Sequence, residues 1–401
     1  ALCFQFVHIL VRDCGRKAII FSLPLAKGQG VCYNRMRKCR QCKERQEYNM
    51  DRKLRVGIVG TGGISQYHMM GYQALPDTVE VVACCDIDGE KAKKYAEKYG
   101  IPAVYTDCRE MYQKENLDAI SVTTWNSAHC DPTIEALEAG INVLCEKPMA
   151  LNAAQAQKML DTAKRTGKLL EVGFVRRFGK DAEAIKKCID AGLLGDIYYA
   201  KAVYLRRRGC PGGWFGDKAF SGGGPLIDLG VHVMDLVRYL SGSPMPISAF
   251  GSTFSGLPLG DDLDPKAWFI KDGGDHPFNV EDFTSGVVKF DNGLTLTVEA
   301  SFNLNIEDDY SYVELFGTKA GIRLDPFKVY TKLSPEDQKL LPKKDPEFEF
   351  EPTFCAEIAH FVDCCRNGTP CRAPAEDGVV LMKMIDAIYK SAETGKSVDI
   401  R

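Results

Sequence analysis

Residues 54–65 read LRVGIVGTGGIS, an apolar strand that runs directly into a glycine-rich turn and the start of a helix. The first glycine permits a tight turn, and the second lets the backbone approach a pyrophosphate. The helix that follows directs its first amides and the positive end of its dipole at the bound anion. Ser65 stands where a third glycine is usual and is small enough for close packing. We therefore expect cofactor contacts from Gly60, Gly62, Gly63 and Ile64.

Short apolar strands continue to alternate with helix-length segments after this turn. Strands are expected at 55–59, 79–85, 119–122, 142–145 and 169–172, and helices at about 64–75, 89–99, 128–139 and 152–166. This spacing is typical of a parallel, doubly wound sheet. We therefore predict an α/β Rossmann domain over residues 50–175.

The pattern becomes rich in strands after about residue 175. Strands are expected at 197–206, 246–254, 283–290, 294–303, 311–316 and 321–324, with helices at 178–191, 354–366 and 377–393. Asp291-Asn292-Gly293 lies between two alternating runs, which is a strong hairpin signal. Residues 255–279 are rich in Gly, Pro and Asp and predict a long loop. We therefore predict a second, α+β domain over 176–401 with a large open antiparallel sheet.

The first 49 residues differ from the rest, with ten Lys or Arg against three Asp or Glu and five of the 16 cysteines. We expect this segment to be a non-native or disordered extension outside the fold, for instance translated upstream sequence ahead of a start at Met50. A basic transit peptide is a second reading. A small zinc or nucleic-acid element is a third, but Cys39 and Cys42 form only one CxxC pair, which is a weak metal signal. We expect no metal site.

Composition sets the broad class of the protein. Hydrophobic residues make up 45% of the chain, charged residues 26%, and the net charge is −3, so nothing favours nucleic acid or a membrane surface as partner. The chain has no stretch of about 18 uncharged apolar residues of the kind that spans a bilayer. The other cysteines are scattered through expected strands and helices, as free thiols are in a reducing compartment, which favours the cytoplasm.

Asp86 directly follows the expected strand 79–85, 21 residues past Ser65. An acid at this spacing accepts hydrogen bonds from the adenosine ribose and repels a 2′-phosphate. The pattern therefore favours NAD over NADP as cofactor. The alternative is an ordinary glycine-rich turn without a ligand.

Two further motifs carry candidate chemistry. Glu146-Lys147-Pro148 follows strand 142–145, at the edge where ligands bind such sheets, and an ammonium there stabilises a developing alkoxide. In the glycine-rich stretch 222–236, Asp228 and His232 are four residues apart on one predicted helical face. A neutral imidazole accepts a hydroxyl proton near neutral pH. Taken singly, the lysine is better explained as a solvated residue at a strand end, and the Asp/His pair as a satisfied polar pair in a helix.

Together these motifs resemble the Gfo/Idh/MocA family, the glucose–fructose oxidoreductase and inositol dehydrogenase group. The resemblance covers about 54–400 and also rests on Val172-Gly173-Phe174-Val175-Arg176-Arg177-Phe178 and on Glu314-Leu315-Phe316-Gly317-Thr318. It implies a Rossmann domain, a C-terminal substrate-binding and oligomerisation domain, and a homodimer or homotetramer assembled through the C-terminal sheet.

The resemblance also implies roles for particular residues. Lys147 and His232 are the implied catalytic pair, with Asp228 binding substrate or assisting the base, and all three contact the substrate. Arg176 is implied to line the nicotinamide side, and Glu146 and Lys147 to lie beside the cofactor. One departure is Trp125, where family members commonly have Pro. We still expect Thr124 and Asn126 to touch the cofactor, and His129 to make local contacts.

The expected function is interconversion of a secondary alcohol and a ketone on a sugar, glycoside or cyclitol ring, with NAD as cofactor. Trp214 is a candidate pocket residue, because an aromatic ring can stack on a sugar face. Two alternatives remain open. One is a glycoside-cleaving enzyme that oxidises its substrate only transiently, and the other is a non-catalytic NAD-binding regulator.

Overall fold

The computed structural model describes residues 6–13, 16–24, 52–256, 276–331 and 333–400. Contacts divide the chain into two units, 1–51 and 52–401. In the first unit, β1 (Phe6–Asp13) and β2 (Arg16–Pro24) pair antiparallel. The sequence interpretation placed no element there, whereas both strands are rich in Val, Ile and Phe, which favour strands. The Cys39/Cys42 pair lies outside the described residues.

The second unit contains a parallel sheet of six strands in the order β5-β4-β3-β6-β7-β8. The strands are β3 (Leu54–Val59), β4 (Val79–Cys85), β5 (Ala103–Tyr105), β6 (Ala119–Val122), β7 (Asn142–Glu146) and β8 (Leu170–Gly173). The expected doubly wound sheet is confirmed. Strand β5 was not expected, because three residues are too few to show a period.

Helices connect these strands: α2 (Ser65–Gln73), α3 (Gly89–Tyr99), α4 (Cys108–Lys114), α5 (Cys130–Glu138) and α6 (Ala153–Thr166). Helix α6 has a capping residue at each end. The Asn152 side chain accepts a hydrogen bond from the Gln155 amide at the start of α6, and Gly167 ends that helix in the left-handed conformation. Helix α4 was missed, as was the strand before it.

The chain then crosses to a second sheet, of order β15-β14-β13-β9-β12-β11-β10-β16. Its strands are β9 (Ile197–Leu205), β10 (Pro246–Phe254), β11 (Phe283–Phe290), β12 (Thr295–Ser301), β13 (Tyr310–Gly317), β14 (Gly321–Leu324), β15 (Lys328–Val329) and β16 (Val398–Asp399). The expectation of an antiparallel sheet was wrong at one pair. Strand β9 is inserted between β13 and β12, and it runs parallel to β12.

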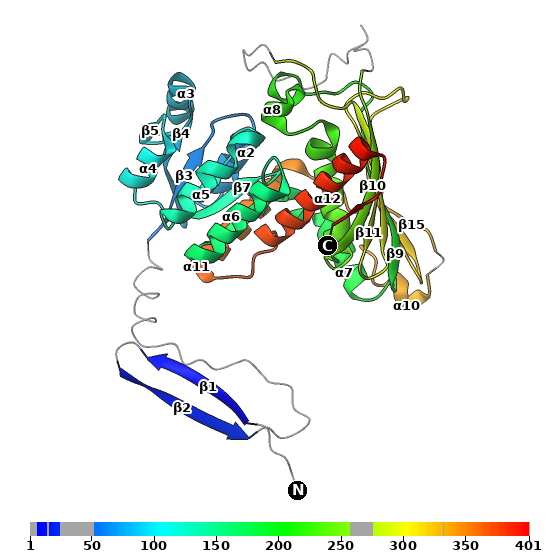
Figure 1. Cartoon of the computed structure of the whole chain (residues 1–401), viewed down its shortest axis with the longest axis horizontal. Coiled ribbons are helices and arrows are strands. Elements are labelled where there is room, and N and C mark those ends of the chain that lie inside the picture. Colours follow the sequence, from blue (N-terminus) through cyan, green and yellow to red (C-terminus); the bar gives the residue numbers. More distant parts are fainter. Residues whose placement is uncertain (1–5, 14–15, 25–51, 257–275, 332, 401) are drawn as a thin grey trace. The chain divides into compact units, whose positions relative to one another are not determined.

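Helices α7 (Lys180–Asp190), α8 (Lys218–Ser221), α9 (Val231–Leu240), α10 (Pro335–Gln338), α11 (Phe350–Asn367) and α12 (Ala375–Thr394) complete the unit. Helix α11 packs on α2 of the parallel-sheet region, and α12 lies between α6 and β10 (Figure 1). Helices α11 and α12 therefore pack against the parallel-sheet region, and α12 also packs against the second sheet.

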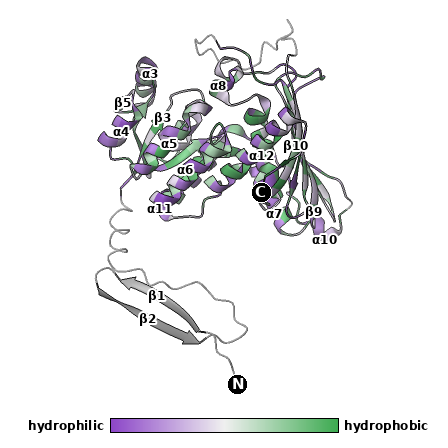
Figure 2. Ribbon diagram, viewed as in Figure 1, coloured by the Kyte–Doolittle hydropathy of each residue, from purple (hydrophilic) through white to green (hydrophobic). Residues whose placement is uncertain are grey.

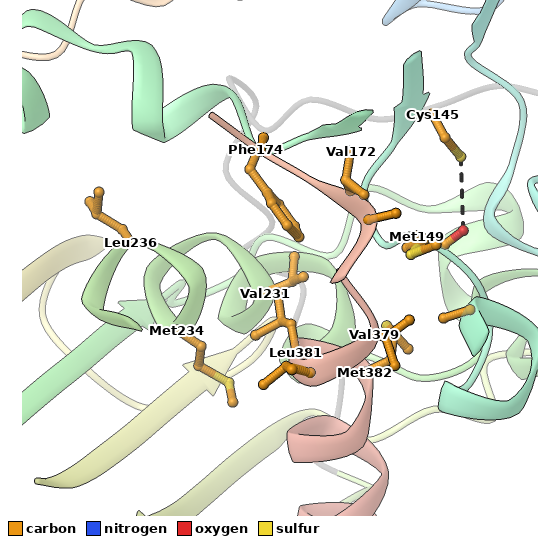
Figure 3. Packing of buried hydrophobic residues seen from close by; sticks show 14 of the residues in the cluster. Cys145, Met149, Val172, Phe174, Val231, Met234, Leu236, Val379, Leu381 and Met382 are labelled. Atoms are coloured by element: carbon orange, nitrogen blue, oxygen red, sulfur yellow. Dashed lines mark hydrogen bonds between the residues drawn. The ribbon is translucent and has the colours of Figure 1, made fainter. Parts of the chain in front are cut away.

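The core is continuous between the two sheets. Figure 3 shows Val172 and Phe174 of the parallel-sheet region beside Val231 of α9 and Leu381 of α12. Figure 2 shows hydrophobic residues along the inner strands and hydrophilic residues on the outer helices. Within the described residues, none of the helices combines the length and the apolar character needed to cross a bilayer.

Candidate active site

The glycine turn after β3 has the backbone that the sequence predicted. Gly60 has φ +88°, and a Cβ there would lie 2.8 Å from the Thr123 carbonyl. A Cβ at Gly62 would meet nothing within 4 Å. The fold therefore requires glycine at position 60, because any side chain there would be strained and would clash with Thr123. At Gly62 the open space would allow an anion to approach the backbone closely.

Asp86 lies at the end of β4, next to this turn. Its Oδ2 accepts hydrogen bonds from the Thr61 amide and hydroxyl, both at 2.8 Å, and lies 3.3 Å from Lys91 Nζ. Burial alone would raise its pKa, but the hydrogen bonds from Thr61 and Asp88, with Lys91, lower the pKa below the ordinary value. The carboxylate is therefore ionised at neutral pH, as a ribose-binding acid must be.

Lys147 follows β7 and reaches across to the second region. Its Nζ lies 3.1 Å from Asp228 Oδ1 and 3.2 Å from the Asp228 carbonyl oxygen. Glu146, just before it, is buried and accepts a hydrogen bond from the Lys147 amide at 3.1 Å. The other carboxyl oxygen of Glu146 lies 2.8 Å from His68 Nε2. The lysine is thus held at both its backbone and its side chain.

Asp228 and His232 lie on one continuous helical segment, which opens with a π-helical turn over Leu226–Gly230 and continues as α9. Inserted π-helical turns often occur at functional sites, because they redirect side chains. Both residues face the same cavity, as the four-residue spacing predicted. Neither ring nitrogen of His232 is hydrogen-bonded to any described residue.

The environment of His232 favours the neutral imidazole. Burial is the largest influence, and the positive charges of Lys147, Arg176 and Arg206 act in the same direction. Together they lower the pKa of His232 well below its ordinary value. At neutral pH the ring can therefore accept a proton.

Two adjoining cavities connect these groups. One, of about 760 Å³, is lined by Lys147, Asp228 and His232. The other, of about 550 Å³, extends past the glycine turn to Asp86. Residues that line both are Gly63, Ile64, Thr124, Trp214 and Phe215. A cofactor that spans both cavities would reach from the ribose-binding acid to the Lys/His pair, so the residues present fit a dinucleotide.

Three other residues considered in the sequence line one or both of these cavities. Asn126 lines the larger cavity, and its amide donates to the Ser221 carbonyl at 2.8 Å. Trp214 lines both cavities and stacks on Phe215 at a ring separation of 3.9 Å. Trp125 lines the smaller cavity, so the unusual residue at this position still faces the predicted cofactor path.

Arg176 and His129 are not among the residues that line the two cavities. The Arg176 guanidinium lies 3.1 Å from Asp181 and 2.9 Å from Asp325. His129 makes local contacts, as expected, to the carbonyl oxygens of Thr124 and Pro148.

Sequence reasoning missed two features of the site. Glu281 is buried and accepts hydrogen bonds from the Gly224 and Leu226 amides, which fixes the turn before Asp228. Arg206 lines the larger cavity beside Tyr204. No sequence motif marks either residue as part of the site.

The chain is similar to several known proteins. The GFO_IDH_MocA model, described as an oxidoreductase family with an NAD-binding Rossmann fold, matches residues 54–174. The GFO/IDH/MocA C-terminal domain model matches 182–323. The chain is 35% identical over 355 residues to D-glucoside 3-dehydrogenase of Escherichia coli K12, covering 86% of this chain and 97% of that one.

It is also 27% identical to the NAD-dependent scyllo-inositol 2-dehydrogenase of Bacillus subtilis 168, covering 88% and 97% of the two chains. A solved structure of levoglucosan dehydrogenase with NADH superposes with a TM-score of 0.73 at 24% identity, over 87% of this chain and all of that one. That likeness establishes the shared fold.

Proposed function

The chain belongs to the GFO/IDH/MocA family of NAD-binding oxidoreductases, and from this premise we propose that it oxidises a secondary ring hydroxyl of a sugar or glycoside. Like its relatives it is an NAD-dependent dehydrogenase of the sugar and cyclitol group. The name of the E. coli relative makes glucosides the first compounds to test.

One observation carries the proposal. Lys147 Nζ, the Asp228 carboxylate and the His232 ring line one cavity, and that cavity adjoins the one beside the glycine turn and Asp86. An ammonium and an unpaired neutral imidazole are the two groups that alcohol oxidation needs, one to stabilise the oxygen and one to accept its proton.

The residues divide the work as follows. His232 accepts the proton of the substrate hydroxyl, because its lowered pKa leaves the ring neutral at pH 7. Lys147 donates a hydrogen bond to the same oxygen as negative charge develops on it. Asp228 holds the Lys147 ammonium at 3.1 Å and so keeps it directed at the cavity. When bound, NAD would supply the hydride acceptor that this oxidation requires.

Trp214 and Arg206 are proposed to position the ring. Trp214 offers an aromatic face at the junction of the two cavities, and Arg206 offers donors to ring hydroxyls. The cofactor contacts are proposed to come from Gly62, Gly63 and Asp86.

The direct test is NADH formation at pH 7 with a panel of glucosides, free sugars and inositols. On the best substrate, Lys147→Met is expected to lower kcat by about 10²–10³-fold and His232→Asn by about 10²–10⁴-fold. Both variants are expected to retain NAD binding, because neither group lies at the phosphate turn.

Lys158→Met is the matched control, since Lys158 is exposed on α6, and it should retain full turnover. Wild-type rates in both site variants would overturn the assigned roles. Glycoside cleavage without net NADH would identify the transient-oxidation enzyme instead.

A further inference from the structure

The larger cavity extends beyond the catalytic groups, along helix α2. Four residues at intervals of three line it there: Ile64, just before the helix, and Tyr67, Met70 and Gln73 within it. At this spacing each side chain is a neighbour of the next on the helix surface. The row covers about 14 Å along the helix axis, at 1.5 Å per residue. Because Ile64 also lines the smaller cavity, the row begins where the two cavities adjoin and leads away from the glycine turn.

Three aromatic rings form one wall of this extension. Tyr67 of α2 stacks on Phe354 of α11 with ring centres 5.2 Å apart, and it meets Phe350 edge to face at 4.9 Å. The rings of Phe350 and Phe354 lie 5.0 Å apart. All three line the same cavity as Lys147 and His232. Helices α2 and α11 therefore present a preformed aromatic surface to a ligand that extends from the catalytic groups.

Packing between α2 and α11 explains only part of this wall. Phe354 is 2% exposed and belongs to that packing, whereas Phe350 is 47% exposed although its ring contacts both others. A large exposed aromatic side chain that lines a cavity is typical of a ligand-binding surface. The rim is polar, with exposed side chains at Gln66, Gln73 and Glu351. An apolar wall with a polar rim suits an apolar group attached to a hydrophilic one.

A single sugar ring would fill only one end of the cavity. The proposed reaction holds the ring between Lys147 and His232, whereas Met70 and Gln73 line the far part of the row. The cavity of about 760 Å³ is of the size that takes drug-sized ligands. In a glycoside, the substituent leaves the ring at a carbon other than the one that is oxidised. It therefore projects away from the catalytic pair and into the rest of the cavity.

We propose that this extension binds the aromatic aglycone of a glucoside, which makes aryl glucosides the preferred substrate class. Tyr67 and Phe350 contact the aglycone ring, and Met70 contacts its far edge. The inference rests on the proposed function, since the ring to be oxidised must lie beside Lys147 and His232. A free sugar or an inositol has no group to place against the aromatic wall and binds through its ring contacts alone.

The experiment uses the full-length protein with phenyl and methyl glucosides in both anomeric forms, and with maltose and cellobiose. Isothermal titration calorimetry in the presence of NADH should show about tenfold tighter binding of a phenyl glucoside than of the matching methyl glucoside. With NAD, kcat/KM should favour the phenyl glucoside by a similar factor. Equal affinities for the two glucosides would overturn the proposal. So would tightest binding of a disaccharide, which would identify the extension as a second sugar subsite.

Variants locate the preference in the wall. Phe350→Ala and Tyr67→Leu should each bring the ratio of phenyl to methyl glucoside affinity toward one, whereas Phe350→Tyr, which keeps the ring, should preserve it. Tyr198→Ala is the matched control, because Tyr198 is 57% exposed on β9 and lines neither cavity. It should leave the ratio unchanged. A ratio that stays at the wild-type value in both wall variants would overturn the proposal.

The two measurements keep this inference apart from the proposed function. If no sugar or glucoside yields NADH, the proposed function fails, and the affinity ratio still decides whether the wall binds an aryl group. If methyl and phenyl glucosides are oxidised with equal kcat/KM and bind equally well, the proposed function stands and the inference fails.

Discussion

At the scale of single residues, the chemistry of the site depends on the charges around one imidazole. His232 faces Lys147 at the end of β7, Arg176 after β8 and Arg206 after β9. All three are cations, and each favours loss of the imidazole proton. Three separate segments therefore set the protonation state of a single side chain.

This environment predicts the pH dependence of turnover. The base must be neutral to act, and its folded-state pKa lies below 6.5. Activity should therefore persist as pH falls through 6.5 and decline only once the pH reaches the lowered pKa of His232. The acid limb of a kcat/KM profile measures this directly. An acid limb centred above 6.5 would contradict the assignment of His232 as the base.

Substitution of Arg176 should shift the acid limb of the kcat/KM profile, although Arg176 does not line either cavity. Arg176→Met removes one of the three cations, and it also leaves Asp181 and Asp325 without their partner. Both changes favour the protonated imidazole, so the acid limb of kcat/KM should move to higher pH. Lys180→Met, on the exposed face of α7, should leave it in place. Coincident profiles for Arg176→Met and wild type would show that Arg176 does not act on His232.

At the scale of elements, the two glycines of the turn after β3 have different roles. Gly60 is needed for the stability of the fold, and Gly62 is expected to be needed for NAD binding. Gly60→Ala forces a Cβ against Thr123 at positive φ, and should destabilise the protein by about 1–3 kcal/mol. Gly62→Ala has free space in the protein, so it should leave thermal stability unchanged and weaken NAD binding. Differential scanning fluorimetry and NADH fluorescence titration measure the two effects. A destabilised Gly62→Ala with normal NAD affinity would contradict the predicted path of the pyrophosphate.

The sequence predicted the elements that carry periodic or capping signals. The bounds of β4 and β6 were predicted to the residue, and α6 lies within the expected range 152–166, between its caps Asn152 and Gly167. The catalytic candidates could be paired in advance because strand ends and helix faces have fixed geometry.

Other features depend on contacts between distant segments. Glu281 reaches Gly224 across 57 positions, and Arg176 turns toward Asp325, 149 positions away. Cys371 donates a hydrogen bond to Glu171, which lies 200 positions earlier in the sequence. Such pairings leave no local period or motif, so sequence reading could not find them.

At the scale of the whole molecule, one face of the second sheet is covered and the other is a candidate for self-association. Gly251 of β10 packs against Ile388 of α12, so Phe250 points to the opposite face, where it is 47% exposed. A cross-strand row continues from it through Val287, Thr297 and Lys201 to Glu314.

We predict that this face forms the homodimer or homotetramer contact. Phe250→Glu places a charge in the predicted contact and should shift the protein to a smaller species in size-exclusion chromatography with light scattering. Val104→Glu, on β5 of the other sheet, should leave the assembly unchanged. A monomeric wild type, or an assembly indifferent to Phe250→Glu, would contradict the prediction.

We propose that one ring hydroxyl of the substrate binds between Lys147 and His232, beside the nicotinamide. A crystal structure of the protein with NADH and the best glucoside tests it most directly. We expect one substrate oxygen within hydrogen-bond distance of both Lys147 Nζ and a His232 ring nitrogen, with its carbon facing the nicotinamide C4. A substrate bound with its reacting hydroxyl in contact with neither side chain would contradict it.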